Sequence, residues 1–210
     1  MSTRLVVVRH GETEWNLASR IQGHADSPLT PAGQAQAAAI AERLAGERFD
    51  RLVSSDLGRA WRTAQAIAAR TGHAIVADAR LRERNYGLAE GLTYGEIGVH
   101  YPEIFSRVRD TDPDYVVPGG ESRRQLFERI RDAFESLARE FDGARLAVVC
   151  HGGVLAALYR HIHGIPAGAS RAIPIPNASY NALAYDGGRW EVEAWADTAH
   201  LVATEPFVEP

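Results

Sequence analysis

The sequence near the N-terminus places two basic side chains directly at the end of an apolar strand. Residues 5–8 read Leu-Val-Val-Val, and Arg9, His10 and Gly11 follow without a spacer. A short β-branched run of this kind is typical of a strand that is buried on both faces. Ligands of open α/β sheets gather at the carboxyl ends of the strands, so we expect Arg9 and His10 to lie at a site. An imidazole beside a fixed guanidinium suits attack on phosphorus, because the guanidinium holds the charge on the oxygens.

A second segment repeats this pattern far along the chain. The apolar residues 146–150 run into His151, Gly152 and Gly153, and a helix is predicted to start at once. A single histidine at a strand end is more often structural, since a buried imidazole only needs a hydrogen-bond partner. Two histidines at equivalent strand ends, each followed by a glycine that permits close backbone approach, favour a shared site instead. The helix after His151 would also direct free N–H groups toward an anion there.

A third strand–turn–helix segment places Arg59 in the first turn of a predicted helix. The strand is expected over residues 49–53, the turn and cap over 54–56, and the helix over 57–70. A cation at a helix N-terminus opposes the helix dipole, so Arg59 needs an anion nearby. The alternative is a solvated surface arginine, which is the interpretation we give Arg62. This segment alone supports both interpretations equally.

The order of predicted elements indicates an α/β fold. A strand and a helix alternate through most of the chain, and a hairpin closes it around the Asp-Gly-Gly turn at 186–188. This alternation predicts a three-layer α/β/α sandwich with a mostly parallel central sheet and the hairpin at one edge. The length of 210 residues suggests a single domain over residues 1–210. The further expected elements are helices over 31–46, within 93–105, over 121–141 and over 154–163, and strands over 74–76, 180–185 and 190–195.

Composition excludes several kinds of partner. The formal net charge is −4 and no run of basic residues exceeds two, so neither nucleic acid nor an acidic membrane surface is an expected partner. No apolar stretch approaches about 18 residues, so no membrane span is expected. The single cysteine, Cys150, excludes an intramolecular disulfide. The N-terminus enters the first strand almost at once, which leaves no room for a signal peptide and predicts a cytoplasmic protein. The oligomeric state is open, with a homodimer as one alternative.

Five sequence motifs follow one another along the chain. They are Arg-His-Gly-Glu-Thr-x-x-Asn at 9–16, Gln-Gly at 22–23 with Asp-x-Pro-Leu-Thr at 26–30, Ser-x-Leu-x-Arg-Ala-x-x-Thr-Ala at 55–64, Leu-x-Glu at 81–83 and His-Gly-Gly at 151–153. In this order the motifs resemble the histidine phosphatase superfamily, and in particular its phosphoglycerate mutase branch. The resemblance covers residues from about 4 to 195 and implies the fold of the phosphoglycerate mutases.

The resemblance implies a catalytic role for five residues. His10 would be the nucleophile that forms a phosphohistidine, and its attacking nitrogen must be unprotonated. Arg9, Arg59 and His151 would bind the phosphoryl oxygens and stabilise the developing charge. Glu83 would be the general acid for the leaving oxygen and then the base for water.

The resemblance also implies a set of binding residues. Asn16 and the backbone of Gly152 would add neutral donors to the phosphoryl group. The remaining members of the expected binding set are Gln22, Gly23, Arg84 and Tyr86. Neither a metal nor another cofactor is implied, and the partner would be a small phosphorylated substrate.

Without the resemblance, Glu83 would be interpreted as part of a surface ion pair with Arg82 or Arg84. Glu90, the other carboxylate in the same irregular segment, is the alternative candidate for the general acid.

The motifs do not agree on whether such an enzyme is a phosphatase or a mutase. Residues 83–87 resemble the mutase pattern, but Gly-Leu-Thr-Tyr at 91–94 lacks the lysine of the mutase Gly-Leu-Asn-Lys. Mutases also carry an adjacent arginine pair, whereas Arg107 and Arg109 are not adjacent. The segment 118–122 and the short chain resemble the phosphatase branch, although Ala89 stands where that branch usually has tryptophan.

A mutase must hold its dephosphorylated intermediate and keep water off the phosphohistidine, which takes extra cationic contacts and a closing lid. Losing such contacts favours hydrolysis of the phosphohistidine by water, so we favour a phosphatase over a cofactor-dependent phosphoglycerate mutase. A catalytically inactive binding protein is the third alternative, and the complete set of catalytic residues argues against it.

Overall fold

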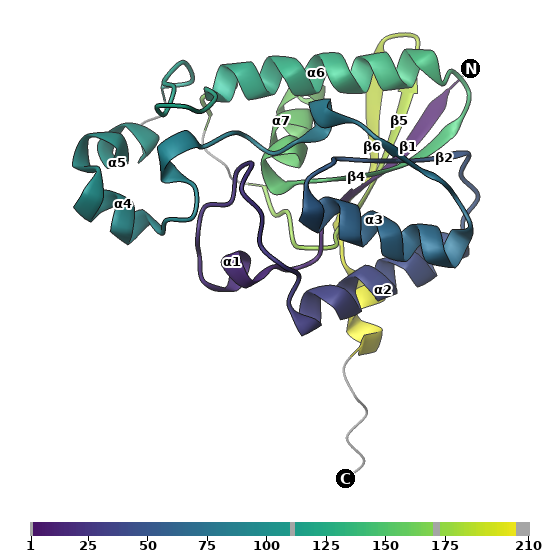
Figure 1. Cartoon of the computed structure of the whole chain (residues 1–210). Coiled ribbons are helices and arrows are strands. Elements are labelled where there is room, and N and C mark those ends of the chain that lie inside the picture. The colour runs from purple at the N-terminus through teal and green to yellow at the C-terminus, as the bar shows by residue number, and fades with distance from the viewer. Residues whose placement is uncertain (1, 110–111, 170–172, 205–210) are drawn as a thin grey trace.

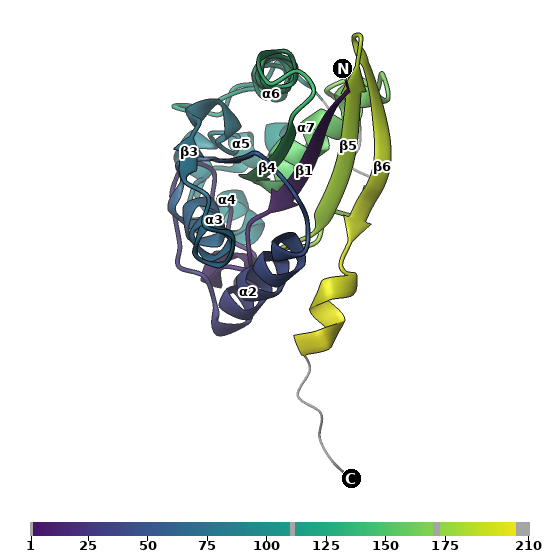
Figure 2. The ribbon, with the colours of Figure 1, turned by 90° about the vertical axis from the view of Figure 1, so that its right-hand side faces the viewer.

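The computed structural model describes residues 2–109, 112–169 and 173–204 (Figure 1). Within these ranges a six-stranded sheet has the order β3-β2-β4-β1-β5-β6. The first four strands in the chain run parallel, and the last two form an antiparallel hairpin at one edge (Figure 2). The strands are β1 (Thr3–Arg9), β2 (Arg51–Ser54), β3 (Ile75–Ala77), β4 (Arg145–Cys150), β5 (Tyr180–Asp186) and β6 (Arg189–Asp197).

Helices cover both faces of this sheet and complete the predicted three-layer sandwich. Figure 1 shows α6 and α7 on one face and α2 and α3 on the other. Successive residues of a strand point to opposite faces, so Val7 packs in the apolar cluster under α6 and α7, and Val8 packs in the cluster under α2 and α3. The four covering helices are α2 (Pro31–Ala45), α3 (Gly58–Thr71), α6 (Arg123–Glu140) and α7 (Gly152–Ile162).

The predicted elements are confirmed, with differences at their ends and in the middle of the chain. The segment 93–105 holds two helices rather than one, because the first helix ends at His100, with Tyr101 as its C-cap, and Pro102 begins a second helix directly after it. The last helix begins at Gly152 rather than 154. Short helices within the described ranges that we did not predict are α1 (Glu14–Leu17), η1 (Ala79–Leu81), η2 (Gly87–Ala89) and η3 (Ala199–Thr204), and the two middle helices are α4 (Tyr94–His100) and α5 (Pro102–Arg109).

The strand register brings the ends of three strands together. In the β1–β4 pair Arg9 lies opposite Cys150, and the His10 amide donates to the Cys150 carbonyl at 3.0 Å. On the other side of β4, the amide of Ser55 donates to the Val149 carbonyl at 2.9 Å. The residues that follow β1, β2 and β4 therefore lie at one edge of the sheet. In the part of the chain that the structure describes, no helix is long and apolar enough to cross a membrane.

Candidate active site

His10 is fixed through its backbone on two sides. Its amide bonds to β4, and its carbonyl oxygen accepts from the Asn177 side-chain amide at 3.0 Å and from the Ala178 amide at 3.2 Å. Its side chain is buried, with 2% of the residue exposed. Asn177 is a functional candidate that the sequence analysis missed, because it lies in an irregular proline-rich segment with no motif of its own.

The hydrogen bonding of His10 selects one tautomer of its ring. Nδ1 lies 2.7 Å from the carbonyl oxygen of Gly11. A carbonyl oxygen can only accept, so Nδ1 carries the proton and Nε2 keeps its lone pair. Burial lowers the pKa of His10 well below its ordinary value of 6.5, and the charges of Arg59 and Arg9 lower it further. The ring is therefore neutral at physiological pH, with a free lone pair on Nε2.

His151 lies beside His10, with 5.3 Å between the ring centroids. Its Nε2 is 2.8 Å from the hydroxyl oxygen of Ser55, the residue that follows β2. Its Nδ1 is buried and has no hydrogen-bond partner among the described residues. Burial also lowers the pKa of His151, and the charges of Arg59 and of the neighbouring His10 lower it further. Both predicted strand-end histidines thus occupy one site in a neutral form.

Arg59 is buried in the first turn of α3, with 1% of the residue exposed, so the surface interpretation is wrong. Its guanidinium donates to the carbonyls of Gly23 at 2.8 Å and Ala25 at 2.9 Å. Asp26 Oδ1 accepts from the Arg59 amide at 3.1 Å and lies 3.4 Å from its guanidinium. The cation at this helix N-terminus is thus partly compensated by the loop that precedes α2, and its charge still reaches both histidine rings.

Arg9, the last residue of β1, is half-buried and points toward the segment before β5. Its guanidinium donates to the Ile175 carbonyl at 2.7 Å. Its charge contributes to the lowered pKa of both His10 and His151. Two guanidinium groups and two imidazoles therefore share this edge of the sheet, which suits an anionic ligand.

The loop residues near the site have mixed roles. Gly23 has a positive φ of 58°, and an added Cβ there would lie 2.0 Å from a carboxylate oxygen of Glu90. Gln22 is buried, and its Oε1 has no hydrogen-bond partner among the described residues. Asn16 Oδ1 accepts from the backbone of Thr13 and from Asn177, so only its Nδ2 side is left as a donor to a ligand.

Glu83 does not form the surface ion pair that was its alternative interpretation. Its Oε1 accepts from the Arg84 amide at 2.7 Å, and its Oε2 accepts from the Gly153 amide at 2.8 Å. Arg82 pairs with Asp56 instead. The charge of Glu83 acts on the pKa of Arg59 and of Cys150, which places its carboxylate beside the strand-end site. Glycine at 153 permits this approach, because a Cβ there would lie 2.0 Å from Glu83 Oε1.

Glu90, the alternative acid, is occupied by backbone amides. Its Oε1 accepts from His24 at 2.8 Å and Tyr86 at 2.9 Å, and its Oε2 accepts from Ala25 at 2.9 Å. These bonds tie the loop that holds Arg59 to the segment after Glu83. Glu90 therefore organises the backbone of both segments.

Arg84 and Tyr86 lie next to each other, with the guanidinium 4.9 Å from the tyrosine ring centroid. Arg84 is buried and donates to the carbonyl of Glu121 at 2.8 Å. Burial raises the pKa of Tyr86 to about 12, so its hydroxyl stays protonated at neutral pH. Ala89, where the phosphatase branch usually has tryptophan, is fully buried in an apolar cluster with Ile97. The departure at this position therefore affects the packing under α4.

Comparisons with known proteins identify the family of this chain. The family model described as histidine phosphatase superfamily (branch 1) matches residues 5–198. The chain is 43% identical to the metal-independent phosphoserine phosphatase of Arabidopsis thaliana over 202 residues, which are 95% of this chain and 83% of the relative. It is 40% identical to phosphoglycerate mutase-like protein 4 of the same plant over 204 residues, 95% of this chain and 87% of the relative.

Among solved structures, a mycobacterial glucosyl-3-phosphoglycerate phosphatase superimposes with a TM-score of 0.81 at 34% identity, covering 94% of this chain and all of the other. The chain belongs to branch 1 of the histidine phosphatase superfamily and is an enzyme of that family. Within the branch it is one of the phosphoglycerate mutase-like proteins.

Proposed function

We propose that this chain hydrolyses phosphomonoesters of small metabolites through a phosphohistidine on His10. The observation that carries the proposal is the neutral, buried ring of His10, whose Nδ1 is fixed by the Gly11 carbonyl and whose Nε2 keeps its lone pair. A nucleophile in this form attacks without first losing a proton. Arg9, Arg59 and His151, which share this edge of the sheet with His10, would bind the phosphoryl oxygens and stabilise the charge that develops on them.

The reaction has two steps. In the first, Nε2 of His10 forms a bond to phosphorus, the bond to the leaving oxygen breaks, and Glu83 gives that oxygen its proton. In the second, Glu83 takes a proton from water, the water oxygen bonds to phosphorus, and the phosphorus–nitrogen bond breaks to release phosphate. Glu83 returns to its protonated state and His10 to its neutral state.

Hydrolysis is favoured over phosphoryl transfer between glycerates by the residues that are missing. The lysine of the mutase motif is absent from 91–94. Arg107 is bound by Asp112 at 2.9 Å and lies over the Tyr115 ring, so it is not held ready for a ligand. The side chain of Arg109 lies outside the described residues. The names of the phosphoserine and glucosyl-3-phosphoglycerate phosphatases also support a phosphatase, whereas Arg84 and Tyr86 keep the mutase as the alternative.

A panel of phosphorylated metabolites tests the proposal. It should include O-phosphoserine, a glucosylated phosphoglycerate, a sugar phosphate, 3-phosphoglycerate and p-nitrophenyl phosphate, with and without 2,3-bisphosphoglycerate. We expect phosphate release from at least one alkyl phosphate without the bisphosphate. Interconversion of 2- and 3-phosphoglycerate that requires the bisphosphate would establish the mutase instead. Binding without turnover of any ester would establish the inactive binding protein.

A further inference from the structure

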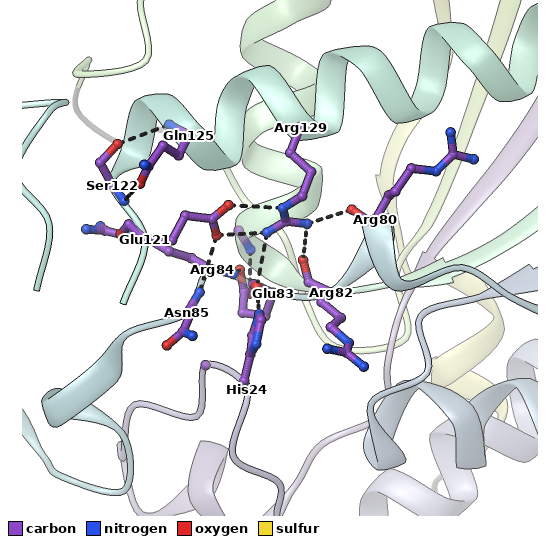
Figure 3. Close-up of polar contacts among 12 residues, drawn as sticks. His24, Arg80, Arg82, Glu83, Arg84, Asn85, Glu121, Ser122, Gln125 and Arg129 are labelled. Carbon is purple, nitrogen blue, oxygen red and sulfur yellow. Dashed lines mark hydrogen bonds and ion pairs between the residues drawn. The ribbon is translucent and has the colours of Figure 1, made fainter. Parts of the chain in front are cut away.

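Arg129 lies on α6, and its guanidinium donates hydrogen bonds to the backbone of the segment that carries Glu83. One terminal nitrogen donates to the carbonyls of Arg80 at 2.6 Å and Arg82 at 2.9 Å, and the other donates to the carbonyl of Glu83 at 3.3 Å (Figure 3). The same guanidinium forms a two-point ion pair with Glu121, at 3.0 and 2.8 Å. All of these contacts come from one side chain on a rigid helix.

Beyond Arg80, which belongs to η1, the segment that Arg129 binds has no regular structure of its own. Residues 82–86 connect η1 to η2, so neither a helix nor a sheet positions their backbone. Their carbonyl groups need donors from elsewhere, and arginine is suited to this because it offers five N–H donors in a planar fork. A lysine in the same place would carry a single ammonium group, which cannot bind three carbonyls and a carboxylate together.

Two further contacts fix the same segment from other directions. His24 Nε2 donates to the carbonyl of Glu83 at 2.9 Å, opposite the contact from Arg129. The Glu121 backbone amide donates to the carbonyl of Asn85 at 2.8 Å, and its carbonyl accepts from Arg84 at 2.8 Å. Figure 3 shows Glu121 and Arg129 side by side above this segment. The Glu83 main chain is therefore held between α6 and the loop before α2.

The Arg129–Glu121 pair is not an ordinary surface ion pair. The side chains are 24% and 16% exposed, and both take part in further backbone contacts. The pair thus lies where loss of either partner changes the backbone around Glu83 rather than only a surface charge.

We propose that Arg129, oriented by Glu121, is a positioning residue that places the Glu83 carboxyl for proton transfer. The proposal rests on the acid role of Glu83 proposed above. Arg129 acts through the main chain of residue 83 and does not itself contact the substrate. Proton transfer needs the donor within hydrogen-bond reach of the leaving oxygen, and a displacement of about 1 Å can cost on the order of 10²-fold in rate.

The test compares leaving groups in Arg129→Met. An alkyl phosphate needs a proton on its leaving oxygen, whereas p-nitrophenyl phosphate does not. We expect kcat/KM for the alkyl ester to fall by roughly 10–100-fold and kcat/KM for the aryl ester by less than about threefold. The matched control is Arg131→Met, two residues along the same helix, where the exposed arginine bonds Asp132; it should change neither value. Arg129→Lys should restore little of the lost activity toward the alkyl ester.

A double variant separates positioning from a general loss of structure. In a Glu83→Gln background there is no acid to place, so adding Arg129→Met should leave the ratio of the two kcat/KM values unchanged. Equal losses for both esters, or no loss for either, would overturn the proposal. If Arg129→Met does not fold, Glu121→Gln carries the same test on the other member of the pair. A wild-type protein that hydrolyses neither ester would instead refute the proposed function.

Discussion

The carboxylate of Glu83 lies at the N-terminus of α7, where its Oε2 accepts a hydrogen bond from the amide of Gly153 at 2.8 Å. The first amides of a helix have no partner within the helix and favour a carboxylate or a phosphate. Gly153 follows His151 by two residues, so this bond ties Glu83 to the strand end that carries the second histidine. A residue with no regular structure around it thereby becomes part of the site.

Glu83→Gln should cost more with poor leaving groups than with good ones. A glutamine cannot donate a proton to an alkoxide, and general acid catalysis is typically worth about 10²–10⁴-fold. We expect a loss of that size in kcat/KM for an alkyl phosphate and a much smaller loss for p-nitrophenyl phosphate. The comparison uses kcat/KM, because a role as base in the hydrolysis step would depress kcat for both esters. Equal losses in kcat/KM would remove Glu83 from the role of leaving-group acid.

Glu90→Gln should behave differently, because Glu90 binds three backbone amides. A glutamine turns one acceptor oxygen into an NH₂ group that faces a backbone donor, which costs on the order of 1–3 kcal/mol. We expect a lower melting temperature and losses in kcat/KM that are the same for alkyl and aryl esters. A selective loss with the alkyl ester would restore Glu90 as the candidate acid.

His10→Ala should abolish phosphate release while the protein remains folded. Without Nε2 no covalent intermediate can form, and the expected loss is several orders of magnitude in kcat. Circular dichroism and thermal melting would verify the fold, and rapid alkali quenching with labelled substrate, which preserves the acid-labile phosphohistidine of the wild type, would verify that the intermediate is absent from the variant. A variant that keeps a tenth of the wild-type activity would contradict the assignment of His10 as the nucleophile.

Acid should destabilise the protein through its buried histidines. Burial lowers the pKa of His10 and His151 below the ordinary value of 6.5. Between that value and the lower folded-state pKa, the unfolded chain binds more protons than the folded one. The free energy of unfolding is therefore fully retained above about pH 6.5 and falls as the pH falls, by at most about 1.4 kcal/mol per pH unit for each ring.

The variant His10→Gln measures this contribution. Denaturant unfolding between pH 7.5 and 5 gives the free energy of unfolding as a function of pH. This dependence should be shallower for the variant than for the wild type, by at most the slope that one bound proton produces. The histidines that both proteins keep contribute equally to both pH dependences, so the difference between the two slopes reports on His10. Identical slopes would mean that His10 is not held neutral by its surroundings.

Activity should survive a chelator. Two arginines and two histidines supply the positive charge and donors that a phosphoryl group needs. In the described part of the chain, no group of three or more histidine, cysteine, aspartate or glutamate residues could hold a metal ion. We expect unchanged kcat/KM after dialysis against EDTA. Complete inactivation that a divalent ion reverses would refute the metal-independent mechanism.

The positions of Arg9, His10 and His151 could be predicted from the sequence because they depend on a local rule. An apolar run that stops abruptly ends a buried strand, and the carboxyl ends of parallel strands meet at one edge of a sheet. The family motifs extended this to Arg59 and Glu83, for which local patterns were ambiguous. The start of a helix could also be predicted where a capping residue or a proline marks it, as Thr30 and Pro31 do for α2.

Only the tertiary structure decided which groups each side chain of the site contacts. The register that sets Arg9 opposite Cys150 brings the two histidine rings together. The Glu83 carboxylate binds the Gly153 amide, and Arg129 binds the carbonyls of Arg80, Arg82 and Glu83. No periodic pattern in the sequence relates these segments. These contacts arise because irregular backbone must satisfy its hydrogen bonds with whatever donors the packed fold brings near. A sequence pattern specifies an element and its faces, whereas such partners depend on how distant elements pack.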